Sequence, residues 1–272
     1  MRTNMHTHST FCDGKDQPEE MVRTAIELGF DILGFSGHGY SPYDDAAMSP
    51  QNMQEYIREI RRLREKYRDR ITVYLGVEED KTKRIESKDP YDFVIGSVHF
   101  LEKDGEFRSV DYSEEVTDRI IEDWFHGSFI DYAEAYYREV SELASFEEVD
   151  IIGHLDLLMK YNDHEKYIRF DDPDYLAIAK ACIDRLGGRR IYEVNTGAMA
   201  RGYRTNPYPD RCLLAYMKEK NLRVMLNSDC HDRRNLAFGY EPSLKLLKEI
   251  GFRELWILKN GQFQPADIHL FH

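Results

Sequence analysis

The sequence predicts an α/β fold in which parallel strands are joined by crossover helices. Short apolar runs, typical of buried strands, alternate with helical patterns through nearly all of the 272 residues. No internal repeat, low-complexity tract or Pro/Ser-rich linker interrupts this alternation. These observations favour one domain spanning residues 1–272, and a chain of this length can bury a sizeable core.

Each predicted helix or strand follows from its own pattern, taken in chain order. Strands are expected at the short apolar runs, at residues 3–8, 31–36, 71–77, 93–98, 149–154, 190–195 and 222–227, with another possible at 254–258. Helices are expected where the apolar period is longer, at residues 18–28, 51–67, 113–144, 173–186, 209–220 and 242–250. Gly29, Gly187 and Gly251 follow helical stretches, and Pro173 and Pro242 stand where helices can begin.

Residues 100–146 depart from the alternation. A turn-like Glu-Lys-Asp-Gly sequence at 102–105 is followed by a long helical pattern rich in aromatic and acidic residues. We interpret this region as an enlarged βα insertion, which lies between a strand and the helix that follows it. Loops at the carboxyl end of barrel strands are where such folds build substrate specificity.

The charge balance argues against two classes of binding partner, and the cysteine content indicates the cellular compartment. The chain has 37 Lys+Arg and 50 Asp+Glu, a net charge of −13, which argues against affinity for nucleic acid or an anionic membrane. Its four cysteines include no CxxC pair and are too sparse for a disulfide scaffold, which indicates a reducing compartment. No apolar run is long enough to span a bilayer, and the N-terminus lacks the apolar stretch of a signal peptide. We therefore expect a cytoplasmic protein with no membrane partner.

Six of the ten histidines stand at or just beyond the ends of predicted strands, together with three carboxylates. His6 and His8 end the first strand, and residues i and i+2 point to the same side, so both imidazoles can reach one ion. Asp229 and His231 form a second pair with this spacing. The full set of candidate metal ligands is His6, His8, Asp13, His38, Glu78, His99, His154, Asp229 and His231.

Such a set predicts a multinuclear metal site. A core does not bury six imidazoles and three carboxylates without partners, and a metal cluster satisfies all of them. Glu78 is the expected ligand rather than Glu79, because Glu79 should alternate to the other face of the strand. Cys230 should point away from the site by the same alternation and act as a small packed residue.

The order of these residues resembles the polymerase and histidinol phosphatase (PHP) superfamily of metal-dependent phosphoesterases. The resemblance runs from Met5 to about His231 and rests on HxH, Gly-His, Gly-x-Glu, a strand-end His, a second Gly-His and a final Asp-x-His. It implies a distorted (β/α)7 barrel with three divalent metal ions at the carboxyl ends of the strands. By the same resemblance, His6, His8, Glu78 and Asp229 would hold one ion, Glu78, His99 and His154 a second, and Asp13, His38 and His231 a third. Mixed histidine and carboxylate sites accept zinc, manganese or iron alike.

Within the superfamily, the chain resembles the stand-alone histidinol-phosphatase branch. The features that carry this are the length, the insertion at 100–146 and the run Tyr-Glu-Val-Asn-Thr-Gly at 192–197. The branch acts in histidine biosynthesis, so the expected substrate is a small phosphorylated metabolite, L-histidinol phosphate, which is hydrolysed to L-histidinol and phosphate. A hydroxide that bridges the metal ions would attack phosphorus.

Further residues receive roles from their positions relative to the strand ends. Arg201 and Lys160 lie in loops where this branch uses cations to bind phosphate, although a lysine loses the bidentate geometry of the arginine often found in the first loop. Glu193 and Asn195 share one strand face and would orient the metal ligands through hydrogen bonds. Asp13 or His38 are candidates for helping the leaving group, and the alternative is that both serve only as ligands.

Other functions stay open at this point. A PHP-type phosphoesterase could act on another small phosphomonoester, or on a phosphodiester or nucleotide. The latter predicts a basic track, which neither the net charge of −13 nor any Lys/Arg cluster near the motifs supplies. A metal-dependent amidohydrolase also uses HxH and a late Asp, but a carboxylated lysine often bridges its site where this chain offers Glu78. A non-catalytic metal-binding protein is the last alternative, and three ions with open coordination argue against it.

Overall fold

Seven parallel strands form the central sheet of the computed structural model, which describes residues 1–83 and 87–272. Their order across the sheet is β1-β2-β3-β4-β7-β8-β9, which is also their order along the chain. Their bounds are β1 Thr3–Asn4, β2 Ile32–Phe35, β3 Thr72–Asp80, β4 Phe93–Ser97, β7 Ile151–Ile152, β8 Ile191–Asn195 and β9 Arg223–Asn227. Because all adjacent pairs are parallel, the carboxyl ends of these strands meet at one end of the sheet.

The outer strands β1 and β9 meet just beyond their regular ends. Thr7 and Cys230 form a parallel bridge there: the His8 amide donates to the Cys230 carbonyl at 2.9 Å, and the Cys230 amide donates to the His6 carbonyl at 3.1 Å. We call this contact the seam. It nearly closes the sheet into a barrel, and the expected distorted (β/α)7 barrel is confirmed.

Strands β1 and β7 are shorter than the runs expected at 3–8 and 149–154, and side chains explain why. The amide of Met5 donates to Oδ1 of Asn227, and the amide of His154 donates to Oε2 of Glu193. Side-chain oxygens thus take the place of backbone partners at the points where both strands stop.

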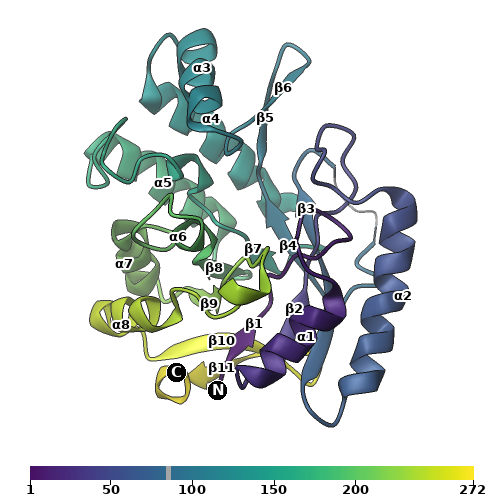
Figure 1. Ribbon diagram of the computed structural model, residues 1–272. Helices are drawn as coiled ribbons and strands as arrows, with labels where there is room; N and C mark the ends of the chain where they lie inside the picture. The colour runs from purple at the N-terminus through teal and green to yellow at the C-terminus, as the bar shows by residue number, and fades with distance from the viewer. Residues whose placement is uncertain (84–86) are drawn as a thin grey trace.

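Helices surround the barrel, as Figure 1 shows. α1 (Pro18–Glu27) and α2 (Pro50–Tyr67) lie on one side of the barrel, and α5 (Pro173–Leu186), α7 (Arg211–Glu219) and α8 (Tyr240–Ile250) on the other. The short helix α6 (Gly197–Ala200) directly follows β8. Proline opens α1, α2 and α5, where its missing amide hydrogen leaves no bond unmade.

The insertion at 100–146 contains a hairpin and two helices above the carboxyl end of the barrel (Figure 1). The hairpin, β5 (Phe100–Lys103) and β6 (Glu106–Ser109), was not predicted, although its turn was. The single helix expected at 113–144 was wrong, because the segment forms α3 (Glu114–Phe125) and α4 (Phe129–Glu142). His126 and Gly127 have φ of 53° and 82°, a left-handed conformation that ends α3.

A second hairpin covers the opposite end of the barrel. The strand expected at 254–258 is present as β10 (Glu254–Lys259), but it pairs antiparallel with β11 (Gln262–Asp267) and not with the barrel sheet. Leu258 of this hairpin packs with the apolar side chains of the barrel interior, which are Met5, Ile32, Tyr74, Phe93, Ile95, Ile151, Ile191 and Met225. A Cβ on Gly76 would lie 2.2 Å from the Phe93 ring, so glycine in β3 makes room for that ring.

A search of the described part of the chain finds no helix with the length and apolar character needed to cross a membrane.

Candidate metal centre

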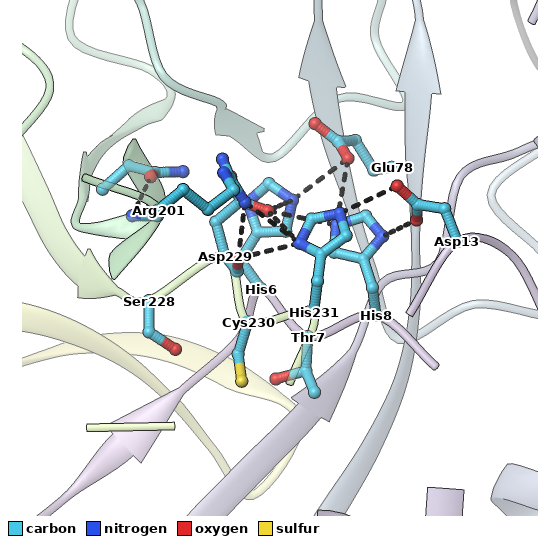
Figure 2. Close-up of polar contacts among 12 residues, drawn as sticks. His6, Thr7, His8, Asp13, Glu78, Arg201, Ser228, Asp229, Cys230 and His231 are labelled. Atoms are coloured by element: carbon cyan, nitrogen blue, oxygen red, sulfur yellow. Dashed lines mark hydrogen bonds and ion pairs between the residues drawn. The ribbon is translucent and has the colours of Figure 1, made fainter. Parts of the chain in front are cut away.

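The predicted ligands converge at the carboxyl end of the barrel, where Figure 2 shows several of them around one centre. Among residues 1–83 and 87–272, three groups of side chains have ligand atoms within 4.8 Å of one another. These groups are His8, Asp13, His38 and His231; His6, His8 and Asp229; and His38, Glu78 and His99. His154 joins them through Glu78, since its Nε2 lies 2.9 Å from Oε1 of that carboxylate. The structure therefore brings every predicted ligand into one cluster.

Glu78 lies in the middle of this cluster. Its Oε2 is 3.0 Å from Nε2 of His6 and 3.1 Å from Nδ1 of His38, and its Oε1 is 3.4 Å from Nε2 of His99. Ser97 of the neighbouring strand β4 donates to Oε1 at 2.6 Å, which fixes the carboxylate. One carboxylate with each oxygen facing different imidazoles has the geometry of a bridging ligand.

Asp229 and Asp13 each lie beside two imidazoles of the cluster. Oδ1 of Asp229 is 3.3 Å from Nε2 of His8 and 3.5 Å from Nε2 of His6. The backbone of Asp229 has φ of 47°, an uncommon conformation for a residue with a side chain and one that is often found at functional sites. Asp13 lies 3.1 Å from Nε2 of His231 and 3.7 Å from Nε2 of His38.

The donor set fits divalent metal ions. Three buried atoms have no hydrogen-bond partner among the described residues: Nε2 of His6, Nε2 of His8 and Oε2 of Glu78. Buried polar atoms are normally paired, and these three face one another. Histidine nitrogens and carboxylate oxygens are the usual ligands of zinc and related ions, so an ion between them would satisfy all three atoms.

The electrostatics of the cluster favour the metal-binding forms of Glu78 and His8. For His6, His38 and His99, burial lowers the pKa but the neighbouring carboxylates outweigh it and raise the pKa, so an ion would displace a proton from each of these rings. Burial by itself raises the pKa of Glu78, but the imidazoles of His6, His38 and His99 outweigh it and hold that pKa well below its usual range. For His8, burial together with the neighbouring His231 and His38 lowers the pKa to about 3. An ionised carboxylate and a neutral imidazole are the forms that bind metal.

Glu193 holds residues of the cluster in place through buried contacts. Its Oε1 lies 2.7 Å from Nδ1 of His6 and accepts from Nδ2 of Asn227 at 2.9 Å. Its Oε2 accepts from the His154 amide and from Nδ2 of Asn195, both at 2.9 Å. Since a carboxylate only accepts, the proton of a neutral His6 ring sits on Nδ1 and leaves the Nε2 lone pair for a metal.

Sequence reasoning missed Asp80 beside the ligands. Oδ2 of Asp80 accepts from the His99 amide at 2.6 Å and lies 3.2 Å from Nδ1 of the same ring. It thus holds His99 as Glu193 holds His6. The signal was present, because Asp80 is two residues beyond Glu78 in β3 and so lies on the same strand face. Glu79, between them, is buried with its side chain against Gly39, as the alternation predicted.

A cavity of about 320 Å³ opens beside the cluster. Its walls include the two predicted phosphate-binding cations, Arg201 and Lys160, and also Lys15 and Asn235, which the sequence analysis did not single out. Arg201 donates to Oδ2 of Asp229 at 3.2 Å, and its side chain is 31% exposed. Lys160 donates to the backbone carbonyl of Asp111 at 2.7 Å and to its Oδ2 at 3.0 Å.

The Lys160–Asp111 pair should stabilise the fold in a pH-dependent way. Burial alone raises the pKa of Asp111, but the charge of Lys160 outweighs it and holds that pKa below its usual range. A depressed carboxyl pKa gives stability that is complete above the unfolded value, about 3.9, and is lost as pH falls through the folded value. We expect Lys160→Met to lose about 1–2 kcal/mol of unfolding free energy at pH 7, measured by urea titration, and the deficit to shrink below pH 4. Exposed Lys259→Met serves as the control, and a deficit independent of pH would contradict this account.

Buried histidine and carboxylate ligands at the carboxyl end of a parallel barrel, beside a cavity with cationic walls, define a metal-dependent hydrolase. The chain belongs to the PHP family, because the PHP domain model matches residues 4–197. This match covers most of the chain and includes the predicted ligands from His6 to His154.

Comparisons with individual proteins agree with this family. The histidinol-phosphatase of Bacillus subtilis is 26% identical over 266 residues, which cover 88% of this chain and 97% of the relative. The crystal structure of a protein from Listeria monocytogenes matches the fold with a TM-score of 0.78 at 24% identity, covering 89% of this chain and 99% of that one. The histidinol phosphate phosphatase of Lactococcus lactis, solved with zinc, L-histidinol and phosphate, matches with a TM-score of 0.70 at 22% identity, covering 97% and 98%. The recognised resemblance to the histidinol-phosphatase branch is confirmed, and the protein is a hydrolase of the phosphatase type.

Proposed function

We propose that the protein hydrolyses L-histidinol phosphate to L-histidinol and phosphate at this metal centre. The observation that carries the proposal is the convergence of the predicted ligands on three buried, unpartnered atoms of His6, His8 and Glu78, of which Glu78 lines the cavity. Curated histidinol-phosphatases match the chain over nearly its whole length, and the Lactococcus lactis enzyme binds both products of this reaction together with zinc.

Three divalent ions are the proposed cofactors, of zinc, manganese or iron. His6, His8 and Asp229 with one oxygen of Glu78 would hold the first, and the other Glu78 oxygen with His99 and His154 the second. Asp13, His38 and His231 would hold the third. The distances among these atoms support this division in part. His8 also faces Asp13, with its Nδ1 at 3.5 Å from Oδ1, and His38 also faces Glu78, with its Nδ1 at 3.1 Å from Oε2.

The protein's own groups would bind and orient the ester. When bound, the ions would neutralise phosphate charge and acidify water at neutral pH. Arg201 borders both Asp229 and the cavity, so its guanidinium can donate to phosphate oxygens in the bidentate manner of arginine. Lys160 adds positive charge to the same cavity while it stays paired with Asp111. Asp13 and His38 line the cavity with 34% and 13% of their side chains exposed. Either of them is a candidate for helping the leaving group, and the alternative is that both serve only as ligands.

A phosphate-release assay tests the proposal. Metal-loaded protein should liberate phosphate from L-histidinol phosphate with a higher kcat/KM than from glycerol phosphate or a nucleoside monophosphate, and should leave a bis-ester such as bis-p-nitrophenyl phosphate almost uncleaved. A chelator should abolish the activity and added zinc or manganese should restore it. Cleavage of other monoesters without cleavage of L-histidinol phosphate would overturn the substrate, and preferential cleavage of the bis-ester would overturn the reaction.

A further inference from the structure

We propose that Lys15 binds the phosphate group of the substrate, together with Arg201. The proposal rests on the phosphatase function above and adds a residue to it. Lys15 lies in the turn after β1, two residues beyond Asp13, and it lines the cavity together with Asp13, His38 and His231.

Within residues 1–83 and 87–272, two other cations line the cavity, and both already contact protein carboxylates. Lys160 donates to two oxygens of Asp111, and only 9% of its side chain is exposed. Arg201 donates to Asp229, and its second terminal nitrogen lies 3.2 Å from Nδ1 of His231. Among the described residues that line the cavity, Lys15 is therefore the cation with the fewest hydrogens committed to protein groups.

The backbone of Lys15 is fixed while its side chain is free to reach the ligand. Its amide donates to the His231 carbonyl at 2.8 Å, across the seam. The preceding turn is tight, because the Gly14 amide donates to the Ser9 carbonyl and a Cβ on Gly14 would lie 2.4 Å from the Ser9 nitrogen. The Lys15 side chain is 69% exposed, and its Nζ lies 3.7 Å from Oδ2 of Asp232, which is beyond hydrogen-bond distance. Asp232 is itself held by Arg234, which donates to both of its oxygens.

The position of Lys15 complements that of Arg201. In Figure 2, Arg201 and Asp13 lie on opposite sides of the His231 ring. Arg201 is near Nδ1 of this ring and Asp13 is 3.1 Å from Nε2, while the Lys15 amide donates to the backbone carbonyl of His231 itself. A tetrahedral phosphate has several oxygens, so it can accept from Arg201 with one and from Lys15 with another. An ammonium on a flexible stem can make and break this contact as phosphate arrives and leaves.

Binding of inorganic phosphate, the reaction product, tests the proposal without reference to the ester. Calorimetric titration of metal-loaded wild type, Lys15→Gln and Lys15→Arg, with equal metal content verified for each, gives the dissociation constants. We expect Lys15→Gln to weaken phosphate binding about tenfold and Lys15→Arg to stay within about threefold of wild type. Lys259→Gln, the same charge change on β10 at the other end of the barrel, should leave binding unchanged. In turnover with L-histidinol phosphate, Lys15→Gln should raise KM far more than it lowers kcat.

The outcomes separate this proposal from the proposed function. Equal phosphate affinity in wild type and Lys15→Gln, or an equal loss in Lys259→Gln, overturns the role of Lys15 even if L-histidinol phosphate is hydrolysed normally. A selective loss in Lys15→Gln supports that role even if the wild type proves inactive on L-histidinol phosphate, in which case only the substrate assignment fails. A lower kcat with unchanged KM and unchanged phosphate affinity also overturns phosphate binding by Lys15.

Discussion

Replacing Glu78 with glutamine should empty most of the metal centre and abolish phosphatase activity. This carboxylate contacts imidazoles from four different strand ends, and both of its oxygens face candidate metal positions. Sites with a full ligand set bind zinc with about 10–16 kcal/mol, so loss of one shared anionic ligand should weaken binding at least about a hundredfold. Metal content by mass spectrometry after dialysis, and kcat/KM for phosphate release, measure the effect.

The neighbouring residue supplies a matched control. Glu79→Gln makes the same chemical change one residue along β3, on the face directed away from the ligands. Burial and the nearby Asp80 carboxylate raise the pKa of Glu79 to about 8, so glutamine resembles the neutral form that predominates at pH 7. Metal content and activity should therefore stay close to wild type in Glu79→Gln. Full metal retention in Glu78→Gln, or equal loss in both variants, would contradict the assignment of Glu78 as a shared metal ligand.

Glu193→Ala should cost both stability and metal affinity. The substitution leaves four buried donors without their acceptor: the His6 ring, the His154 amide and the amides of Asn195 and Asn227. Removing one partner from such a buried charged network costs about 3–5 kcal/mol, and residues that orient metal ligands contribute about 10–100-fold to affinity. Urea unfolding of the chelated protein measures the first effect, and metal titration of the folded variant measures the second.

Glu193→Gln tests the charge and the hydrogen bonds separately. A glutamine can still accept with one oxygen, but its amide nitrogen would face two donors at the position of the lost oxygen. We expect it to lie between wild type and Glu193→Ala in both measurements. Exposed Glu219→Ala on α7 should change stability by less than about 0.5 kcal/mol. A Glu193→Ala protein as stable as this control would contradict the proposed network.

The metal ligands could be predicted from sequence because their signals are local. His6 and His8 share a face by strand alternation alone, and parallel strands bring their carboxyl ends together without any knowledge of register. Lys15 and Asp111 could not be found in this way, since their roles depend on which loops meet across the barrel mouth. The break between the two helices of 113–144 did have a local signal, which is Gly127. The helical periodicity of the aromatic residues on both sides of it led to the prediction of one helix.

The seam has a consequence for the timing of folding. It joins the first and last strands of the barrel, and within it Asn4 donates to Ser228 from a position 224 residues earlier in the chain. Translation at about 5–20 residues per second separates the synthesis of these two strands by roughly 10–45 s. During that interval, His6 and His8 have no Asp229 or His231 to complete their site. We therefore expect a ribosome-bound or truncated chain that ends before Asp229 to bind metal poorly and to hydrolyse nothing, so that activity itself reports synthesis past His231.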